Sequence, residues 1–145
     1  MMERIVSEGH SIGNHTYSHF NGWKTKNNEY LDDISKASKL IDSTLFRPPY
    51  GRILRSQAGK VHEAMNKPNA SIVMWDVLSG DFDTTLSKEQ CLKNVIDHAK
   101  EGSIIVFHDS EKARPLMEYA LPKVLEHFSK KGFRFLNLSS LQNEE

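Results

Sequence analysis

Stretches with helical periodicity alternate with short β-branched and apolar runs along this chain, and the alternation limits the folds that it can adopt. Apolar side chains recur at helical spacing over 30–41 and again over 54–65. Residues 71–75 and 103–107 are short runs of the kind expected for strands buried on both faces. The pattern predicts a parallel sheet or barrel with helices outside it, whose functional residues lie at the carboxyl ends of the strands.

Glycine and capping signals mark two further helices. Residues 2–8 have the pattern of a helix end, and Gly9 is placed to close it. Ser87 is followed by a Gln at the third helical position, a capping-box pattern that predicts a helix continuing over 91–99, which Gly102 closes.

The C-terminal part of the chain predicts one long helix and one strand. Pro115 suits the first turn of a helix that runs to about residue 131. Gly132 ends this helix ahead of a strand at 133–138, and 139–145 is expected to be a frayed tail.

Composition narrows the classes of protein and of partner. The chain has 145 residues, the size of one ordinary domain, so 1–145 is assigned to a single domain. Lys plus Arg and Asp plus Glu both number 19, and this neutral balance gives no reason to expect nucleic acid or anionic lipid as a partner. Cys91 is the single cysteine, which excludes an internal disulfide and a Cys-rich zinc site. The sequence shows neither a membrane span nor the apolar run of a signal peptide, and the compartment stays open.

Two histidines four residues apart are the first candidate for chemistry. The spacing of His15 and His19 can bring both imidazoles onto one metal ion. A metalloprotease helix requires Glu directly after the first His, and Thr16 in that position argues against a protease. Gly9 and Gly13 disfavour a regular helix here, so we expect the pair at a strand-to-loop junction. Taken alone, two unrelated histidines explain the pattern better than a metal site does.

Three later clusters carry further reactive groups. Residues 47–51 form a rigid, proline-containing loop that begins with the permanent cation of Arg47, although a simple turn also fits. Residues 75–82 place carboxylates and aromatics after a predicted strand, as a substrate pocket or a core turn would. His108 and Asp109 end another predicted strand, which makes His108 an acid–base candidate.

In this order and spacing, the clusters resemble the polysaccharide deacetylase (NodB homology) family, whose members are carbohydrate esterase 4-like. The match is nearly continuous over 9–109. Residues 9–19 are similar to the family's metal-binding His-Ser/Thr-x-x-His segment, 47–51 to its Arg-x-Pro-x-Tyr segment and 107–108 to its Leu-x-His segment. The resemblance implies a distorted (β/α) barrel that removes acetyl groups from N- or O-acetylated poly- or oligosaccharide.

The resemblance also implies a role for each matching residue. His15 and His19 would bind a divalent metal, most simply zinc. The backbone N–H of Tyr50 would stabilise the oxyanion. His108 would be the general acid, with Asp81 accepting the hydrogen bond of its other ring N–H. Arg47 would hold the catalytic-base aspartate, and the substrate pocket would be lined by Pro49, Trp75, Phe82 and Phe107.

The sequence departs from the family pattern in two places. Residues 75–82 are similar to the family's Asp-x-x-Asp-Trp segment, but Leu78 replaces the first Asp and Phe82 replaces the Trp. The family's first motif, Thr-Phe-Asp-Asp, supplies the base and a third metal ligand, and it has no counterpart in these 145 residues. Asp32 and Asp33 lie on a predicted surface helix and are not expected to replace it.

These departures lead to expectations about the chain as given. We expect the true amino terminus upstream of Met1, a barrel truncated at its first strand, and weak or no activity. An open sheet edge would favour self-association. Two alternatives are a non-catalytic carbohydrate-binding relic of the same fold and a structural metal module, although the latter requires four closed ligands.

Overall fold

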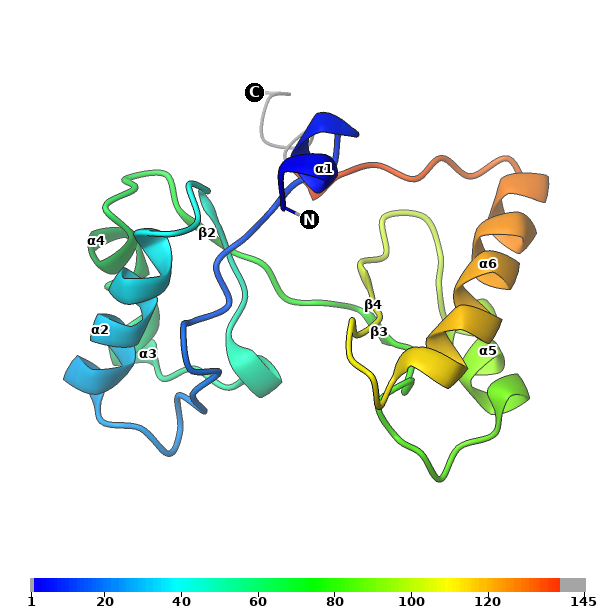
Figure 1. The fold of residues 1–145 in the computed structure, drawn as a ribbon, viewed down its shortest axis with the longest axis horizontal. Coiled ribbons are helices and arrows are strands. Elements are labelled where there is room, and N and C mark those ends of the chain that lie inside the picture. The colour runs from blue at the N-terminus through cyan, green and yellow to red at the C-terminus, as the bar shows by residue number, and fades with distance from the viewer. Residues whose placement is uncertain (1, 139–145) are drawn as a thin grey trace. The chain divides into compact units, whose positions relative to one another are not determined.

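A computed structural model describes residues 2–138, which belong to two compact units (Figure 1). Of the described residues, unit 1 contains 2–74 and 136–138, and unit 2 contains Trp75–Phe135. The predicted frayed tail at 139–145 lies outside the described residues. The assignment of 1–145 to a single domain stays a prediction.

Unit 1 is built from short elements around a parallel strand pair. Its strands β1 and β2 pair in parallel, with Leu45 opposite Ser71, and Asn14 adds an isolated parallel bridge to Phe46. The elements are the helices α1 (Met2–Ser7), α2 (Asn27–Ser38), α3 (Arg55–Ala58) and α4 (Val61–Met65), the 3-10 turn η1 (Pro49–Gly51), and the strands β1 (Leu45–Phe46) and β2 (Ser71–Ile72).

The helices of unit 1 follow the predicted periodicity, with one correction. Helix α1 ends at Ser7, and Gly9 closes it two residues later with a left-handed φ of 84°, as predicted. Helix α2 begins earlier than predicted and stops at Ser38, which leaves Leu40 66% exposed. The single helix predicted over 54–65 is wrong: the chain forms α3 and α4, because Gly59 has a low helix propensity and Lys60 leaves the helical region at φ −114° and ψ 5°.

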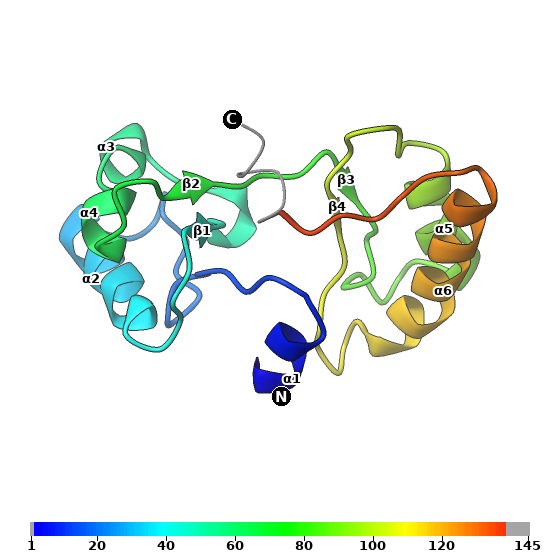
Figure 2. The same cartoon turned by 90° about the horizontal axis from the view of Figure 1, so that it is seen from above.

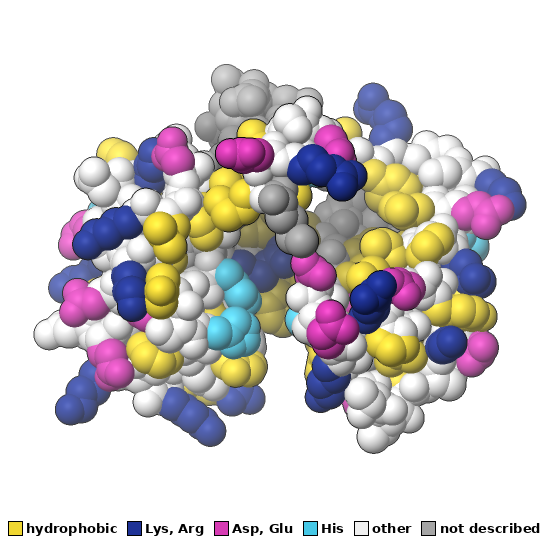
Figure 3. Space-filling view, in the orientation of Figure 1, with side chains coloured by type: hydrophobic (Ala, Val, Ile, Leu, Met, Phe, Trp, Pro, Cys, Tyr) yellow, Lys and Arg dark blue, Asp and Glu magenta, His cyan; other side chains and the backbone are white. Residues whose placement is uncertain are grey.

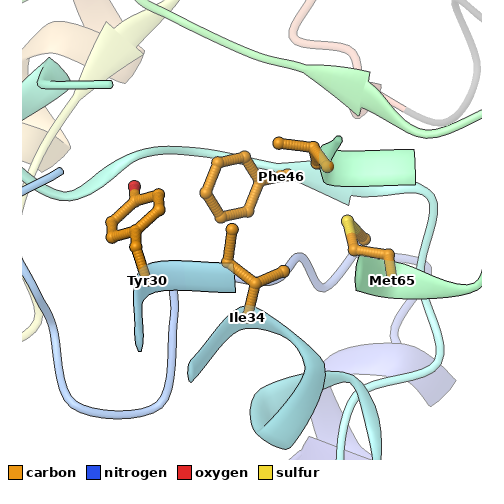
Figure 4. Close-up of a cluster of buried hydrophobic side chains, with 5 residues drawn as sticks. Tyr30, Ile34, Phe46 and Met65 are labelled. Atoms are coloured by element: carbon orange, nitrogen blue, oxygen red, sulfur yellow. The ribbon is translucent and has the colours of Figure 1, made fainter. Parts of the chain in front are cut away.

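The core of unit 1 lies between α2, α4 and β1. Tyr30 and Ile34 point from α2 toward Phe46 of β1, and Met65 of α4 lies beside them (Figure 4). Val61 completes this cluster of buried side chains. Tyr30 and Ile34 belong to the apolar pattern found over 30–41 and Met65 to the one over 54–65, so the helical periodicity located the correct faces of both helices.

Unit 2 pairs two strands and two helices. Strands β3 (Val77–Leu78) and β4 (Ile105–Val106) are parallel, with Val77 opposite Ile105. Helices α5 (Lys88–Ile96) and α6 (Arg114–Lys130) lie side by side (Figure 2). The predicted cap of α5 is confirmed, since the Ser87 hydroxyl accepts the N–H of Gln90 at 3.1 Å. The Gln90 side chain bonds Asn94 instead, so only half of the capping box forms.

Two adjoining apolar clusters form the core of unit 2. Cys91, in the second cluster, is fully buried. Burial, together with the nearby carboxylate of Asp81, raises the pKa of its thiol above the ordinary value. The first cluster consists of Val77, Val95, Val124 and Phe128, and the second of Cys91, Leu116 and Ala120.

The strand predicted at 133–138 is wrong, because residues 133–137 form neither helix nor strand. They begin as the cap of α6. Gly132, at φ 83°, donates to the carbonyl of Ser129, and Phe133 donates to that of Phe128, each at 3.0 Å. The Phe133 ring then packs edge-on against Phe128. This is the Schellman pattern with its usual apolar contact, and it uses the N–H group that would have started the strand.

The strands are also shorter and less buried than predicted. Each has two residues, and both residues of β2 are half-buried rather than buried on both faces. The parallel direction agrees with the prediction, while closure into a barrel stays a proposal. No helix among residues 2–138 combines the length and apolar character that crossing a membrane requires.

Tyr30 provides a test of the unit 1 core. Its hydroxyl is buried and has no hydrogen-bond partner within residues 2–138, and burial together with Asp33 raises its pKa to about 12. An unfolded tyrosine titrates near 10, so the folded state should lose stability as the pH rises from about 10 to about 12. The loss should be on the order of 1 to 3 kcal/mol.

Tyr30→Phe should abolish this alkaline loss and leave stability at pH 7 unchanged or slightly raised, because it removes an unsatisfied buried hydroxyl. Urea unfolding followed by circular dichroism across this pH range measures the effect. Tyr119→Phe, at a half-buried tyrosine of unit 2, is the control. An alkaline loss that persists in Tyr30→Phe would contradict the assignment.

Candidate active site

The residues proposed from sequence form two groups, one in each unit. Three of them follow a parallel strand or bridge closely: His15 comes after the bridge residue Asn14, Arg47 after β1, and His108 two residues after β4. This agrees with the expectation for the carboxyl ends of parallel strands. Unit 1 holds His15, His19, Arg47, Pro49 and Tyr50, and unit 2 holds Trp75, Asp81, Phe82, Phe107 and His108.

In unit 1 the two histidine rings are adjacent. The ring centroids of His15 and His19 lie 4.9 Å apart at an interplanar angle of 69°. His19 also contacts the ring of Tyr50 edge-on, at 4.8 Å. Both histidines are exposed, and Figure 3 shows histidine side chains gathered on the surface of this unit.

The hydrogen bond of His15 determines which ring nitrogen carries the proton. Its Nδ1 lies 2.6 Å from the carbonyl oxygen of Arg47. A carbonyl only accepts, so Nδ1 carries hydrogen and the lone pair of the neutral ring is on Nε2. This is the tautomer that a metal-binding histidine adopts when its other nitrogen bonds a backbone carbonyl.

The residues present supply part of a metal site. Within residues 2–138, no three His, Cys, Asp or Glu side chains are grouped so that they could hold a metal ion. His15 and His19 therefore fit as two ligands, one of them with its tautomer fixed, and a complete site requires further ligands.

The start of the histidine loop is tied to α2 by Asn14, which is 1% exposed. Its Nδ2 donates to the carbonyl of Ile34 at 3.0 Å and to the hydroxyl of Ser38 at 2.8 Å. Its Oδ1 accepts the N–H of Thr16 at 2.9 Å. One buried amide thus connects the residues on both sides of His15 to the helix.

Asp33 holds the middle of the loop, and sequence reasoning missed it. The prediction of a surface position is right for Asp32 and wrong for Asp33, which is 7% exposed. The Asp33 carboxylate accepts the N–H groups of Tyr17 and Ser18 and the hydroxyl of Ser18, at 2.7 to 2.9 Å. Its position three residues after Tyr30 puts it on the apolar face of α2, and that placement was the signal available in the sequence.

Backbone strain is concentrated in the loops that carry these groups. Thr16, His19 and Tyr50 have φ values of 61°, 56° and 59°. Residues other than glycine rarely adopt this left-handed backbone conformation, and a β-branched residue such as Thr16 adopts it least of all. Each such residue costs about 1 to 3 kcal/mol, and strain of this kind persists where the surroundings enforce it, often at functional sites.

Arg47 is oriented by two backbone carbonyls. Its Nε donates to Val73 at 3.2 Å and its Nη2 to Met74 at 3.4 Å. The side chain is half-buried, and this burial lowers the pKa of the guanidinium from its ordinary value. No carboxylate lies within ion-pair distance of it among residues 2–138, and the two backbone carbonyls are its acceptors instead.

In unit 2, a buried carboxylate holds a partly exposed histidine. Asp81 is fully buried, and its two oxygens accept the backbone N–H of His108 at 2.6 Å and the Nδ1–H at 2.7 Å. The His108 side chain is 40% exposed, so its Nε2 edge can face a ligand. Phe82, 39% exposed, lies edge-on to the imidazole at 5.0 Å.

The loop before Asp81 is itself fixed by polar contacts that sequence reasoning did not identify. The Asp81 N–H donates to the hydroxyl of Ser79 at 3.3 Å, and the Asn94 side chain donates to the Ser79 carbonyl at 3.0 Å. Gly80 has φ 79°, and a Cβ there would approach Leu86 to 2.8 Å. The tight turn therefore requires glycine.

The predicted pocket residues have different environments. Phe107 packs against both apolar clusters of unit 2, which gives it a structural contribution whatever its role toward a substrate. Pro49 is buried and Trp75 is half-buried. Phe82, beside His108, is the exposed member, and the pocket roles of all four residues stay predictions.

The chain is similar to known proteins over nearly its full length. A family model for polysaccharide deacetylase matches residues 1–67, which include the histidine loop and Arg47. The peptidoglycan-N-acetylglucosamine deacetylase of Bacillus cereus is 34% identical over 97% of this chain. The chain belongs to the polysaccharide deacetylase family. It spans 52% of the length of that relative.

Solved structures share the fold of this polysaccharide deacetylase family member. A peptidoglycan N-acetylglucosamine deacetylase in complex with a naphthyl N-hydroxybenzamide has a TM-score of 0.83 and 34% identity, covering 95% of this chain and 65% of its own. A CE4 family pseudoenzyme from Bacillus anthracis has a TM-score of 0.79 and 21% identity, covering 97% of this chain and 49% of its own. The second likeness concerns the fold alone.

The Asp81–His108 pair leads to a prediction for this family member that needs no substrate. In Asp81→Asn, the backbone N–H of His108 still needs an acceptor. The amide oxygen of the new side chain is that acceptor, so its NH₂ group faces Nδ1. Nδ1 then has to accept, and the neutral imidazole should shift to the Nε2–H tautomer, as in other His–Asp pairs changed in this way.

Long-range ¹H–¹⁵N NMR of the neutral imidazole distinguishes the two tautomers. Asp109→Asn removes a neighbouring exposed carboxylate and should leave the Nδ1–H tautomer in place. If His108 keeps that tautomer in Asp81→Asn, the carboxylate does not determine it.

Proposed function

We propose that this chain carries the general acid and two metal ligands of a metal-dependent deacetylase that hydrolyses the acetamido group of an N-acetylated glycan. The observation that carries the proposal is the buried carboxylate of Asp81. It accepts hydrogen bonds from the backbone N–H of His108 and from the ring Nδ1–H, the ring nitrogen other than Nε2. The family and the name of the Bacillus cereus relative support a glycan containing N-acetylglucosamine as the substrate class.

His108 would protonate the departing sugar amine from Nε2. An amine leaves poorly without a proton, and a positioned imidazole can supply one near neutral pH. Asp81 holds the ring through Nδ1 and stabilises the charged imidazolium before transfer.

His15 and His19 would hold a divalent metal, most simply zinc. When bound, such an ion polarises an acetyl carbonyl and acidifies water. The Arg47 carbonyl fixes the tautomer of His15, and the backbone N–H of Tyr50, in a strained left-handed residue, is the proposed oxyanion donor. The Arg47 guanidinium would orient the catalytic-base carboxylate, which the family resemblance places in the Thr-Phe-Asp-Asp motif.

We also propose a complete fold and a cellular location. The structural similarity to the peptidoglycan deacetylase, covering 95% of the chain, supports the distorted (β/α) barrel as the complete architecture. A peptidoglycan-type substrate would be met at the cell envelope or outside the cell. Each sheet has two strands among the described residues, and their edges are the proposed surface for self-association.

A non-catalytic carbohydrate-binding relic is the second candidate. It is favoured by the likeness of the fold to that of a CE4 family pseudoenzyme from Bacillus anthracis, at a TM-score of 0.79. The Asp81–His108 arrangement favours the enzyme instead, because a surface that only binds glycan has no use for a proton donor held in this way.

We expect the 145-residue chain to bind Zn²⁺ through His15 and His19, more weakly than a three-ligand site would. Calorimetric titration of the metal-free chain measures this, and a His15→Ala, His19→Ala double variant should lose the binding. His62→Ala, His98→Ala is a matched control that removes two exposed histidines elsewhere. Equal binding by the chain and by the His15, His19 variant would refute the assignment.

We expect the isolated chain to release acetate slowly, and a chain extended upstream to include a Thr-Phe-Asp-Asp-like segment to release it at enzymatic rates. In the extended chain, His108→Asn should lower turnover by about 10²- to 10⁴-fold and leave the metal content unchanged. Acetate release from an N-acetylglucosamine oligomer is the assay, with Asp109→Asn as control. Near-normal turnover in His108→Asn would remove it from the mechanism, and glycan binding without turnover by the extended chain would favour the relic.

A further inference from the structure

We propose that Asp33 is a positioning residue that sets the affinity of His15 and His19 for a divalent metal. It would not touch the metal, but it holds the loop that joins the two histidines. The inference rests on the proposed function, because it takes these histidines as the ligands.

The Asp33 carboxylate is dedicated to this loop. It is 7% exposed, and no Lys, Arg or His lies within ion-pair distance of it among residues 2–138. Its charge is instead compensated by three donors: the N–H groups of Tyr17 and Ser18 at 2.9 and 2.7 Å, both on Oδ2, and the Ser18 hydroxyl at 2.8 Å on Oδ1. Hydrogen bonds to a carboxylate are shorter and stronger than neutral ones.

The donors belong to the two residues at the centre of a strained segment. Thr16 and His19, on either side of them, both have left-handed backbone conformations. The hydroxyl of Thr16 is also buried and without a hydrogen-bond partner in the described part of the chain. A conformation with these disadvantages persists only when its surroundings enforce it. The three bonds to Asp33 provide that enforcement between the two ligands.

Helix α2 is what gives the carboxylate its fixed position. Tyr30 and Ile34, on the same face of the helix as Asp33, are fully buried in the unit 1 core. The same helix accepts the Asn14 side chain at the carbonyl of Ile34. A packed helix, acting through Asp33, therefore fixes the spacing between the two imidazoles. Less of the loop then has to become ordered when a metal binds.

Substitutions can separate this role from a simple effect of charge. Asp33→Ala removes all three bonds. Asp33→Asn loses the charge, but its oxygen can still accept both amide N–H groups while its NH₂ donates to the Ser18 hydroxyl. Asp32→Ala removes the neighbouring exposed charge without touching the loop. Ser18→Ala removes one bond from the loop side and leaves α2 intact, so it serves if Asp33→Ala fails to fold.

The experiment is calorimetric titration of the full 145-residue chain with Zn²⁺. Asp33→Ala should weaken binding by about 10- to 100-fold, the range found when outer partners of metal ligands are removed. Ser18→Ala should weaken it by a smaller factor, and Asp33→Asn should recover most of the affinity. Asp32→Ala should stay within about twofold of the unmodified chain, because an exposed charge is largely screened.

A second measurement requires no metal. Amide hydrogen exchange at Tyr17 and Ser18 should be faster in Asp33→Ala and Ser18→Ala than in the unmodified chain, while Asp32→Ala should leave it unchanged. Unchanged Zn²⁺ affinity in both Asp33→Ala and Ser18→Ala would overturn the positioning role. An unmodified chain that binds no Zn²⁺, or whose binding survives loss of both histidines, would overturn the proposed function.

Discussion

Parallel strand pairing is the constraint on which the candidate site depends. The bridge at Asn14 and the strands β1 and β2 run in one direction in unit 1, so the residues that follow them emerge at the same edge. Two hydrogen bonds connect the residues that follow the bridge, β1 and β2. The His15 ring bonds the Arg47 carbonyl, and the Arg47 side chain donates to the Val73 carbonyl. In unit 2 the parallel pair of β3 and β4 does the same for Asp81 and His108. Strands of two residues suffice because buried side chains hold the loops where a longer ladder would otherwise be required.

The sequence predicted the faces of helices better than the extent of strands. The periodicity of α2 identified Tyr30 and Ile34 as core residues because a helix buries one stripe whatever its exact ends. Apolar runs gave the position of β2 and β4 but not their two-residue length, since a strand exists only where a neighbour offers its backbone groups. Phe133 shows the limit: its apolar, aromatic setting suggested a strand, but its N–H closes α6 through a contact that alternation does not encode.

The site was predictable where chemistry depends on residue order and less so where it depends on packing. The spacing of His15 and His19 and the strand-end position of His108 could be read directly, and the structure supplies an acceptor for an Nδ1–H group of His15 and of His108. Asp33 was missed because a carboxylate on a helix is usually solvated, and only the fold reveals the donors that surround this one. Left-handed backbone at Tyr50 was also outside the reach of sequence patterns, which favour glycine at such positions.

The burial of Cys91 has a practical consequence for work on this chain. Its thiol is packed against the helix residues Leu116 and Ala120 and has a raised pKa, so little of the reactive thiolate forms at neutral pH. A cysteine introduced at an exposed position would therefore be the one that reacts with maleimide or spin-label reagents. Fluorophores or paramagnetic probes can be attached at a chosen place without replacing the native residue and disturbing the α5–α6 core.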